Sequence, residues 1–266
     1  NAKVKKKEIK YELDQNKIKF NLDEKKPKFT NFEDLIDVEI FFLNHSCLVF
    51  KTKKVSFAID PWIFGPAFLG GWWLQKKSPS NSFELLNACD FIFISHNHPD
   101  HLHDLTLNKI RSDMKYYVSN FKTSSTFKYL ESLGKKNIEN LDFGFEYVSE
   151  NLKFLISPMK SGDFRDDSGI YFSIGQFKAI LAVDTNSINF LSLPENITFL
   201  ASSFAGGASG YPVCFDNFDF EAKKNIISRN NNALLAKNKK LITLSNSKFY
   251  MPYASSNMRV GKYGSS

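Results

Sequence analysis

Short apolar runs separated by polar turns dominate the first half of the chain. Val38 to Leu43, Cys47 to Lys51 and Val55 to Ile59 are rich in branched and aromatic residues and predict three successive strands. Phe91 to Ile94 is wholly apolar and predicts a strand buried on both faces. Between the third and fourth runs, residues 60–71 are rich in glycine and aromatic residues, which indicates a long loop.

Helical spacing of apolar residues appears in mid-chain and again near the end. It predicts helices over Leu102 to Ile110, Phe121 to Leu133 and Phe218 to Ala236, with a short strand at Tyr116 to Val118. The other strands that we predict are Leu152 to Ile156, Ile170 to Ile174, Phe177 to Val183 and Ile197 to Ala201. Strands followed by helices, twice over, favour an α/β protein with two stacked sheets and its helices outside.

Charge divides the chain at its N-terminal end. Residues 1–29 hold ten Lys and five acidic residues, so they supply +5 of the total charge of +7 and leave only +2 for the rest. We predict a basic arm or hairpin over 1–29 and one domain over 30–266. The small remaining charge does not argue for an anionic partner.

Two further compositional features limit the class of protein. No apolar run approaches the ~20 residues of a membrane span, and residues 1–10 are lysine-rich without the apolar run of a signal peptide, so we expect a cytoplasmic protein without a membrane partner. Cys47, Cys89 and Cys214 lie far apart and outside any CxxC pair, which predicts reduced thiols and no iron–sulfur centre.

The histidines are concentrated in one place. His45 stands alone, and the other four lie within eight residues of one another. These four are His96, His98, His101 and His103. The cluster follows the buried strand directly, so His96 and His98 project from one side while Asp100 and His101 arrive as the chain turns. Such a corner can serve two adjacent metal ions.

The stretch His96 to His101 resembles the HxHxDH signature of the metallo-β-lactamase superfamily. Several loop sequences resemble one branch of it, the CMP-N-acetylneuraminate hydroxylases. These sequences are Asp60 to Trp62, Gly65 to Phe68, Gly71 to Leu74 and Ser203 to Pro212. The resemblance covers Asp37 to Ala254. It implies an αββα sandwich with a site for one or two metal ions at one edge, and makes 30–266 a catalytic domain.

The resemblance also implies a ligand set, with Asp184 as the bridging carboxylate. A further histidine that the superfamily expects before Asp184 is missing, and counting back without a gap places it on Asp163. Asp166 and Asp167 are alternatives, as is an ordinary solvated acidic turn, and Asp184 has the alternative of a helix N-cap. The implied metal ligands are His96, His98, Asp100, His101, Asp163 and Asp184.

A carboxylate in place of that histidine changes the metal that we expect. Two histidines and one carboxylate suit non-haem iron, whereas an all-histidine site favours zinc. We predict one or two iron ions, with zinc or manganese as alternatives. A final superfamily histidine is also missing, so His45 or His103 either completes the second site or hydrogen-bonds behind the ligands, unless that site is weak or empty. We name Asp100 and His45 as the candidate catalytic residues.

Two loops and two cations are candidates for binding a substrate. The glycine-rich turn can offer backbone N–H groups to an anion, or it is a plain bend. The tryptophans can stack on a sugar or base, or they pack in the core. Lys160 and Arg165 flank Asp163. The candidate residues are Trp72, Trp73, Gly206, Gly207, Ser209, Lys160 and Arg165.

Three functions compete. The first is an iron-dependent oxygenase (a monooxygenase) that acts on a sugar-nucleotide-like or other anionic small molecule, with electrons from a separate protein because the chain has no Rieske-type Cys and His pairs. The second is a metal-dependent hydrolase of an ester, amide or phosphodiester, in which Asp100 orients a metal-bound hydroxide. The third is a non-catalytic protein with a degenerate metal site. No basic stripe lies near the metal loops, so nucleic acid is not favoured as a partner.

Overall fold

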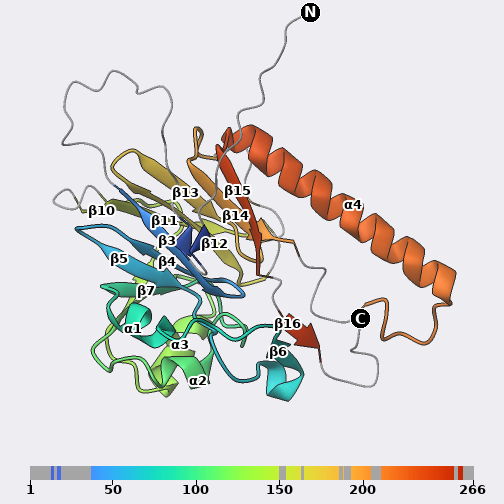
Figure 1. Cartoon of the computed structure of the whole chain (residues 1–266), viewed down its shortest axis with the longest axis horizontal. Helices are drawn as coiled ribbons and strands as arrows, with labels where there is room; N and C mark the ends of the chain where they lie inside the picture. Colours follow the sequence, from blue (N-terminus) through green and yellow to red (C-terminus); the bar gives the residue numbers. More distant parts are fainter. Residues whose placement is uncertain are drawn as a thin grey trace, which may run out of the picture.

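The computed structural model contains two sheets that face each other, with helices on the outside (Figure 1). The described residues are 37–149, 154–162, 165–185, 188, 193–204 and 211–254, with strand residues 13–14, 17–18 and 257–259. Helices α1, α2 and α3 lie on the outer side of the first sheet, and α4 lies beside the second. This arrangement confirms the αββα sandwich of the metallo-β-lactamase type.

The first sheet has eight strands in the order β1-β2-β3-β4-β5-β7-β8-β9. They are β1 (Leu13–Asp14), β2 (Lys17–Ile18), β3 (Glu39–Asn44), β4 (Cys47–Lys51), β5 (Ser56–Ile59), β7 (Phe91–Ile94), β8 (Lys115–Ser119) and β9 (Ile138–Leu141). Pairing is antiparallel up to β5 and parallel from β5 to β9. Its helices are α1 (Ser82–Asn87), α2 (Asp104–Leu107) and α3 (Ser125–Ser132). One helix precedes each of β7, β8 and β9, as parallel pairing requires a crossover.

The second sheet has six strands in chain order, β10 to β15. They are β10 (Tyr147–Ser149), β11 (Phe154–Lys160), β12 (Ser168–Ile174), β13 (Phe177–Leu181), β14 (Phe199–Ser203) and β15 (Phe249–Tyr253). Here too the antiparallel strands come first, and β13, β14 and β15 are parallel. Helix α4 (Phe220–Ser245) is the crossover between the last two. A small separate sheet pairs β6 (Trp72–Leu74), which follows the 3-10 turn η2 (Phe68–Gly70), with β16 (Asn257–Arg259).

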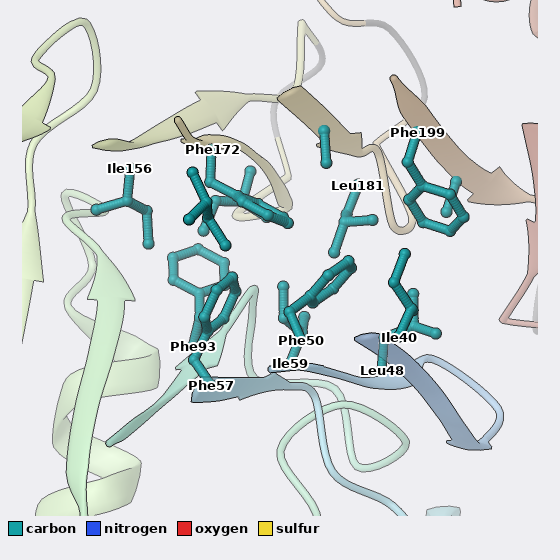
Figure 2. Close-up of a cluster of buried hydrophobic side chains, with 14 of the residues drawn as sticks. Ile40, Leu48, Phe50, Phe57, Ile59, Phe93, Ile156, Phe172, Leu181 and Phe199 are labelled. Atoms are coloured by element: carbon teal, nitrogen blue, oxygen red, sulfur yellow. The ribbon is translucent and has the colours of Figure 1, made fainter. Parts of the chain in front are cut away.

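Aromatic and aliphatic side chains fill the space between the two sheets (Figure 2). The ring of Phe172, from the second sheet, lies 4.7 Å from Phe50 and 4.9 Å from Phe57, both on the first, in edge-to-face contacts between ring centroids. Full burial of one such side chain is worth about 1.5–3 kcal/mol. The inner-face cluster therefore sets how the two sheets, and the loops at their ends, lie against each other.

The outer faces are covered unequally. Leu86, Leu107 and Leu130, one from each short helix, pack against the outer face of the first sheet. Strand β7 is thus buried on both faces, which explains its wholly apolar sequence. On the second sheet, Leu241 of α4 packs against Ile180 and its neighbours.

Most predicted strands form within a few residues of their expected bounds, but the helices differ. Helix α2 spans Asp104–Leu107 rather than 102–110, and α3 is also shorter than predicted. Helix α4 continues to Ser245, where Asn246, with a φ of 46°, ends it in the left-handed conformation. No described helix combines the length and apolarity needed to cross a membrane.

The N-terminal segment contributes a short hairpin. Strands β1 and β2 pair with each other, and β2 extends the first sheet by pairing with β3. The division of the chain at residue 29 stays a prediction.

Candidate metal centre

The ends of the parallel strands bring together residues that are far apart in sequence. Asp60 follows β5, Ser95 and His96 follow β7, and Asp184 follows β13 by three residues. The backbone N–H of Ala254, just past β15, donates to the carbonyl oxygen of His45 at 3.0 Å, which ties the two sheets together at this edge. One edge of the sandwich therefore collects the candidate residues.

Asp60 organises the turn that carries the histidines. It is fully buried and accepts three hydrogen bonds: from the backbone N–H of Ser95 at 2.8 Å, from Ser95 Oγ at 2.6 Å and from His101 Nδ1 at 2.9 Å. With Nδ1 donating to Asp60, His101 keeps the lone pair of Nε2 for another partner. The sequence-based list of site residues missed Asp60. Its signal was a carboxylate directly after an apolar strand.

The first candidate ligand group joins both sheets. It consists of His96, His98 and Asp167, one ligand atom from each lying within 4.8 Å of the others. His96 Nε2 lies 2.8 Å from His98 Nδ1 and 3.7 Å from Asp167 Oδ1. Behind the ring, His96 Nδ1 lies 2.8 Å from Ser95 Oγ, so Nε2 is directed into the group. Two histidines and one carboxylate thus converge at the sheet edge.

Asp167 is held in place by its own turn and by the neighbouring sheet. Its carbonyl oxygen accepts from the N–H of Ser161 at 3.0 Å, and its Oδ2 lies 3.0 Å from Arg165 Nη2. The next residue, Ser168, donates from Oγ to the carbonyl oxygen of Ser95 at 2.6 Å. This bond crosses from β12 to the histidine-bearing turn. It fixes the distance between Asp167 and His96.

The second candidate group is centred on His101, which occurs in both of the remaining sets of candidate ligands. His101 Nε2 lies 3.5 Å from Asp100 Oδ2 and 3.5 Å from Asp184 Oδ2. Two ligand triples contain these residues, one with His96 and Asp184 and the other with His45 and Asp100. Asp184 therefore faces both groups, as a bridging carboxylate would.

Burial and mutual charge shift the pKa values of these side chains. Burial, reinforced by His101, lowers the pKa of His96 well below its usual value, so its ring is neutral and able to ligate. Burial alone would raise the pKa of Asp184, but His101, together with His96 and His45, outweighs it and lowers that pKa. The pKa of Asp100 is also lowered, because His101 and a hydrogen bond from His45 outweigh burial. Asp100 and Asp184 conversely overcome burial to raise the pKa of His101.

These residues fit a metal ion. His101 Nε2 and Asp100 Oδ1 are buried and have no hydrogen-bond partner among the described residues. Buried polar atoms normally have a partner, and a cation between the imidazole and the carboxylates would supply one. Imidazole nitrogens with ionised carboxylates are also the donor set that first-row transition metals take, and a bound cation would displace the proton from His101 Nε2.

The two other histidines have different surroundings. His103 caps the start of α2: its Nδ1 lies 2.9 Å from Thr106 Oγ1, and its Nε2 lies 3.0 Å from the carbonyl oxygen of Pro66. Both ring nitrogens are thus engaged away from the candidate group. His45 Nε2 bonds to Asp100 Oδ2 at 3.0 Å, and its ring packs edge-on against Trp62. In this geometry His45 stands behind Asp100, as in the hydrogen-bonded alternative.

The candidate substrate residues are only partly brought together. Phe68 connects Trp72 to the centre, because its ring lies 4.6 Å from that of Trp72 and 6.3 Å from that of His98. Trp73 is 43% exposed and donates from Nε1 to the carbonyl oxygen of Gly70. Arg165 borders the group through Asp167.

Lys160 ends β11 on the surface, where it pairs with Ser168 across the ladder. Asp166 is hydrogen-bonded to Thr123 Oγ1 rather than to the histidines. Four of the predicted residues lie outside the described part of the chain. These are Asp163, Gly206, Gly207 and Ser209.

An αββα sandwich with a His and Asp cluster at the edge where both sheets end defines the metallo-β-lactamase class of metal-binding proteins. The chain belongs to this superfamily: the model of the β-lactamase superfamily domain matches residues 39–174. Because that match runs from β3 to β12, it includes the whole histidine-bearing turn and Asp167.

Curated relatives are similar over most of the chain. It is 36% identical over 226 residues to the cytidine monophosphate-N-acetylneuraminic acid hydroxylase of Xenopus laevis, which covers 82% of this chain and 38% of that protein. It is 35% identical to the human protein named inactive cytidine monophosphate-N-acetylneuraminic acid hydroxylase, with coverage of 82% and 45%. The chain thus spans less than half the length of these relatives.

Solved structures share the fold at low sequence identity. The diiron β-hydroxylase CmlA from Streptomyces venezuelae superposes with a TM-score of 0.56 at 14% identity, covering 82% of this chain and 44% of that one. The superposition covers more of the chain than the family model does, so the shared fold is not limited to residues 39–174.

Proposed function

We propose that the chain is the catalytic part of a metal-dependent oxygenase, with iron as its metal. The observation that carries the proposal is the grouping of His96, His98 and Asp167, since two histidines and one carboxylate form the ligand set of many non-haem iron oxygenases. The hydroxylase names of the curated relatives and the diiron hydroxylase name of CmlA support it.

The residues divide into two metal positions. His96, His98 and Asp167 would hold one ion, and Asp100 and His101 the other, with Asp184 shared. Iron bound there supplies the activation of dioxygen. Asp60 orients His101, and His45 orients Asp100 through the hydrogen bond at 3.0 Å. Asp163 stays an alternative to Asp167.

The protein side chains would also select the substrate. Arg165, about half exposed and beside Asp167, offers a guanidinium to an anionic group. Trp72 and Trp73, on β6, offer rings to a base or sugar. Lys160 and the turn with Gly206, Gly207 and Ser209 would complete anion binding. We therefore propose a sugar nucleotide as the substrate class, taking CMP-N-acetylneuraminate as the first compound to test.

Isotope labelling tests the proposal. The anaerobically purified protein is supplied with ferrous iron, a chemical reductant, CMP-N-acetylneuraminate and ¹⁸O₂, and the products are analysed by mass spectrometry. A product that carries one ¹⁸O atom from dioxygen, absent from the His96→Ala variant, supports an oxygenase. Incorporation from H₂¹⁸O alone, with bond cleavage and no dioxygen uptake, would instead establish a hydrolase.

A further inference from the structure

The N-terminal part of α4 leaves the sandwich without packing against it. The buried residues of this helix are Asn238, Leu241 and Ser245, all in its last turns. None of the helix residues from 220 to 236 is buried, and Figure 1 shows this part of α4 extending beyond the sheets. At 1.5 Å per residue it is ~25 Å long. Because isolated helices of this length are marginal in water, a partner surface would stabilise it.

Apolar side chains are exposed along this projecting part. Phe220, Ile227 and Leu235 are 76%, 38% and 51% exposed. Phe220 and Ile227 lie seven residues apart, in register with Leu234 and the buried Leu241, so the apolar row that enters the core continues outward along one face. Eight of the fourteen large apolar residues exposed in the described part of the chain lie between residues 204 and 244, and three of these eight are on the projecting part of α4. Such a concentration marks an interaction surface.

The charge of α4 indicates what covers it. The helix has six basic residues and one acidic residue, a net charge of +5. Residues 30–266 together carry +2, so the remainder of this domain is net negative by three charges. Two copies of α4, or α4 and the basic segment 1–29, would repel each other. Charge complementarity favours a protein with an acidic surface.

The anchored end of α4 reaches the candidate metal centre. Lys237 Nζ donates to the carbonyl oxygen of Thr185 at 2.9 Å, and Thr185 directly follows Asp184. Asn238 contacts Ser202 at 3.0 Å and the carbonyl oxygen of Ser203 at 3.3 Å, at the end of β14. Helix α4 therefore connects the projecting part to the loop that carries Asp184, with Ile227 ~15 Å along the helix axis from Lys237.

We infer that the exposed part of α4 is the docking surface for an acidic electron-carrier protein. This inference rests on the proposed function, because hydroxylation consumes two electrons: R–H + O₂ + 2e⁻ + 2H⁺ gives R–OH + H₂O. A one-electron carrier delivers them in two encounters. Its acidic surface pairs with Lys223 and Lys224, which flank the apolar row at 3.6 residues per turn, and its apolar centre covers Phe220 and Ile227.

The test uses reduced plant-type ferredoxin, an acidic [2Fe–2S] carrier, as the probe. The double variant Lys223→Glu with Lys224→Glu is compared with Lys128→Glu with Lys136→Glu, which makes the same charge change on and after α3. Glutamates at 223 and 224, near the helix N-terminus, are compatible with the helix dipole, so the variant should fold. At low ionic strength we expect at least about tenfold weaker ferredoxin binding for the α4 variant, a smaller difference at high salt, and wild-type binding for the control. Ile227→Ser should weaken binding at every salt concentration.

Two readouts separate this inference from the proposed function. Turnover with dithionite should be equal in wild type and the α4 variant, while ferredoxin-dependent turnover should fall only in the variant. No turnover with either reductant would overturn the proposed function and, with it, the role of an electron carrier. Equal ferredoxin binding by the wild type and the α4 variant, or binding of the wild type to anionic phospholipid vesicles but not to ferredoxin, would overturn the docking surface.

Discussion

The two sheets contribute different chemistry to the edge that they share. The first sheet provides the histidines, on one short turn after β7 that the buried Asp60 braces. The second provides two carboxylates, Asp167 and Asp184, on separate turns. His96 is 1% exposed, whereas the side chain of Asp184 is 30% exposed. The first sheet thus fixes the geometry of the centre, and the second adds two carboxylates, of which Asp167 is buried and Asp184 borders solvent.

This difference makes the centre depend on how the sheets pack. Apart from the hydrogen bond from Ser168 to the Ser95 carbonyl, the described hydrogen bonds that brace the histidine turn come from the first sheet, so the turn is expected to keep its shape when the second sheet shifts. Asp167 reaches His96 only because β12 is seated against β7, through the bond from Ser168 and the aromatic core beneath. Changes in the first sheet should therefore affect whether a metal binds at all, and changes in the second sheet should affect which metal is preferred.

Removing a histidine of the first sheet should have the largest effect. His96 belongs to two of the three candidate ligand groups, so we expect His96→Ala to abolish metal retention after dialysis, measured as ions per chain by elemental analysis. His103→Asn is the matched control, since Asn caps helices well and His103 faces away from the group. If His96→Ala retained as much metal as the wild type, the metal would not be bound at this centre.

Loosening the contact between the sheets should have the second-largest effect. Phe172→Ala leaves a cavity between Phe50 and Phe57 and should lower the free energy of unfolding by about 3–5 kcal/mol in urea titrations. Val148→Ala, on an exposed position of β10, should change it by less than about 0.5 kcal/mol. If both variants unfold at the same urea concentration, Phe172 does not join the two sheets as described.

Neutralising the carboxylate of the second sheet should weaken metal binding without removing the histidines. We expect Asp167→Asn to lower iron affinity about 100-fold, which is ~2.7 kcal/mol, in competition with a chelator. Asp166→Asn should retain the wild-type affinity, because its carboxylate bonds to Thr123. A loss of affinity in Asp163→Asn but not in Asp167→Asn would assign the ligand role to Asp163 instead.

Weakening the hydrogen bond between Asp60 and His101 should have the smallest of these effects. Asp60→Asn keeps the shape of the side chain but weakens the hydrogen bond that fixes the His101 tautomer. Loss of such a contact behind a ligand typically costs 10–100-fold in metal affinity, and we expect a value near the lower limit, about tenfold. The same chelator competition measures it. An unchanged affinity would show that Asp60 supports the turn without influencing His101.

The candidate ligands of the first sheet are easier to locate from the sequence than those of the second sheet. The histidines of the first sheet lie within a few residues of one another after an apolar strand, so local pattern alone places them together. Asp167 was one of three carboxylates in an acidic turn. A hydrogen bond between Ser161 and Asp167 joins the two ends of this turn. Counting residues along the chain does not reveal that contact, so it could not single out Asp167. The favoured Asp163 lies outside the described residues.

Asp60 and His103 illustrate two further limits. Asp60 is 35 residues from Ser95, and their contact depends on the parallel pairing of β5 with β7, which local pattern does not reveal. His103 belongs to the histidine cluster in sequence, but the beginning of α2 turns its ring toward Thr106 and Pro66. Proximity in sequence therefore predicted the centre, and only the topology separates ligands from supporting residues.

Metal identity in an Asp167→His variant tests the proposed iron centre most directly. Wild type and variant are purified anaerobically from cells supplied equally with iron, zinc and manganese, and each metal is counted per chain. We expect iron to predominate in the wild type and zinc to replace it in Asp167→His, because an all-histidine group suits zinc. Stoichiometric zinc in the wild type, with the same metal content in the variant, would contradict an iron oxygenase.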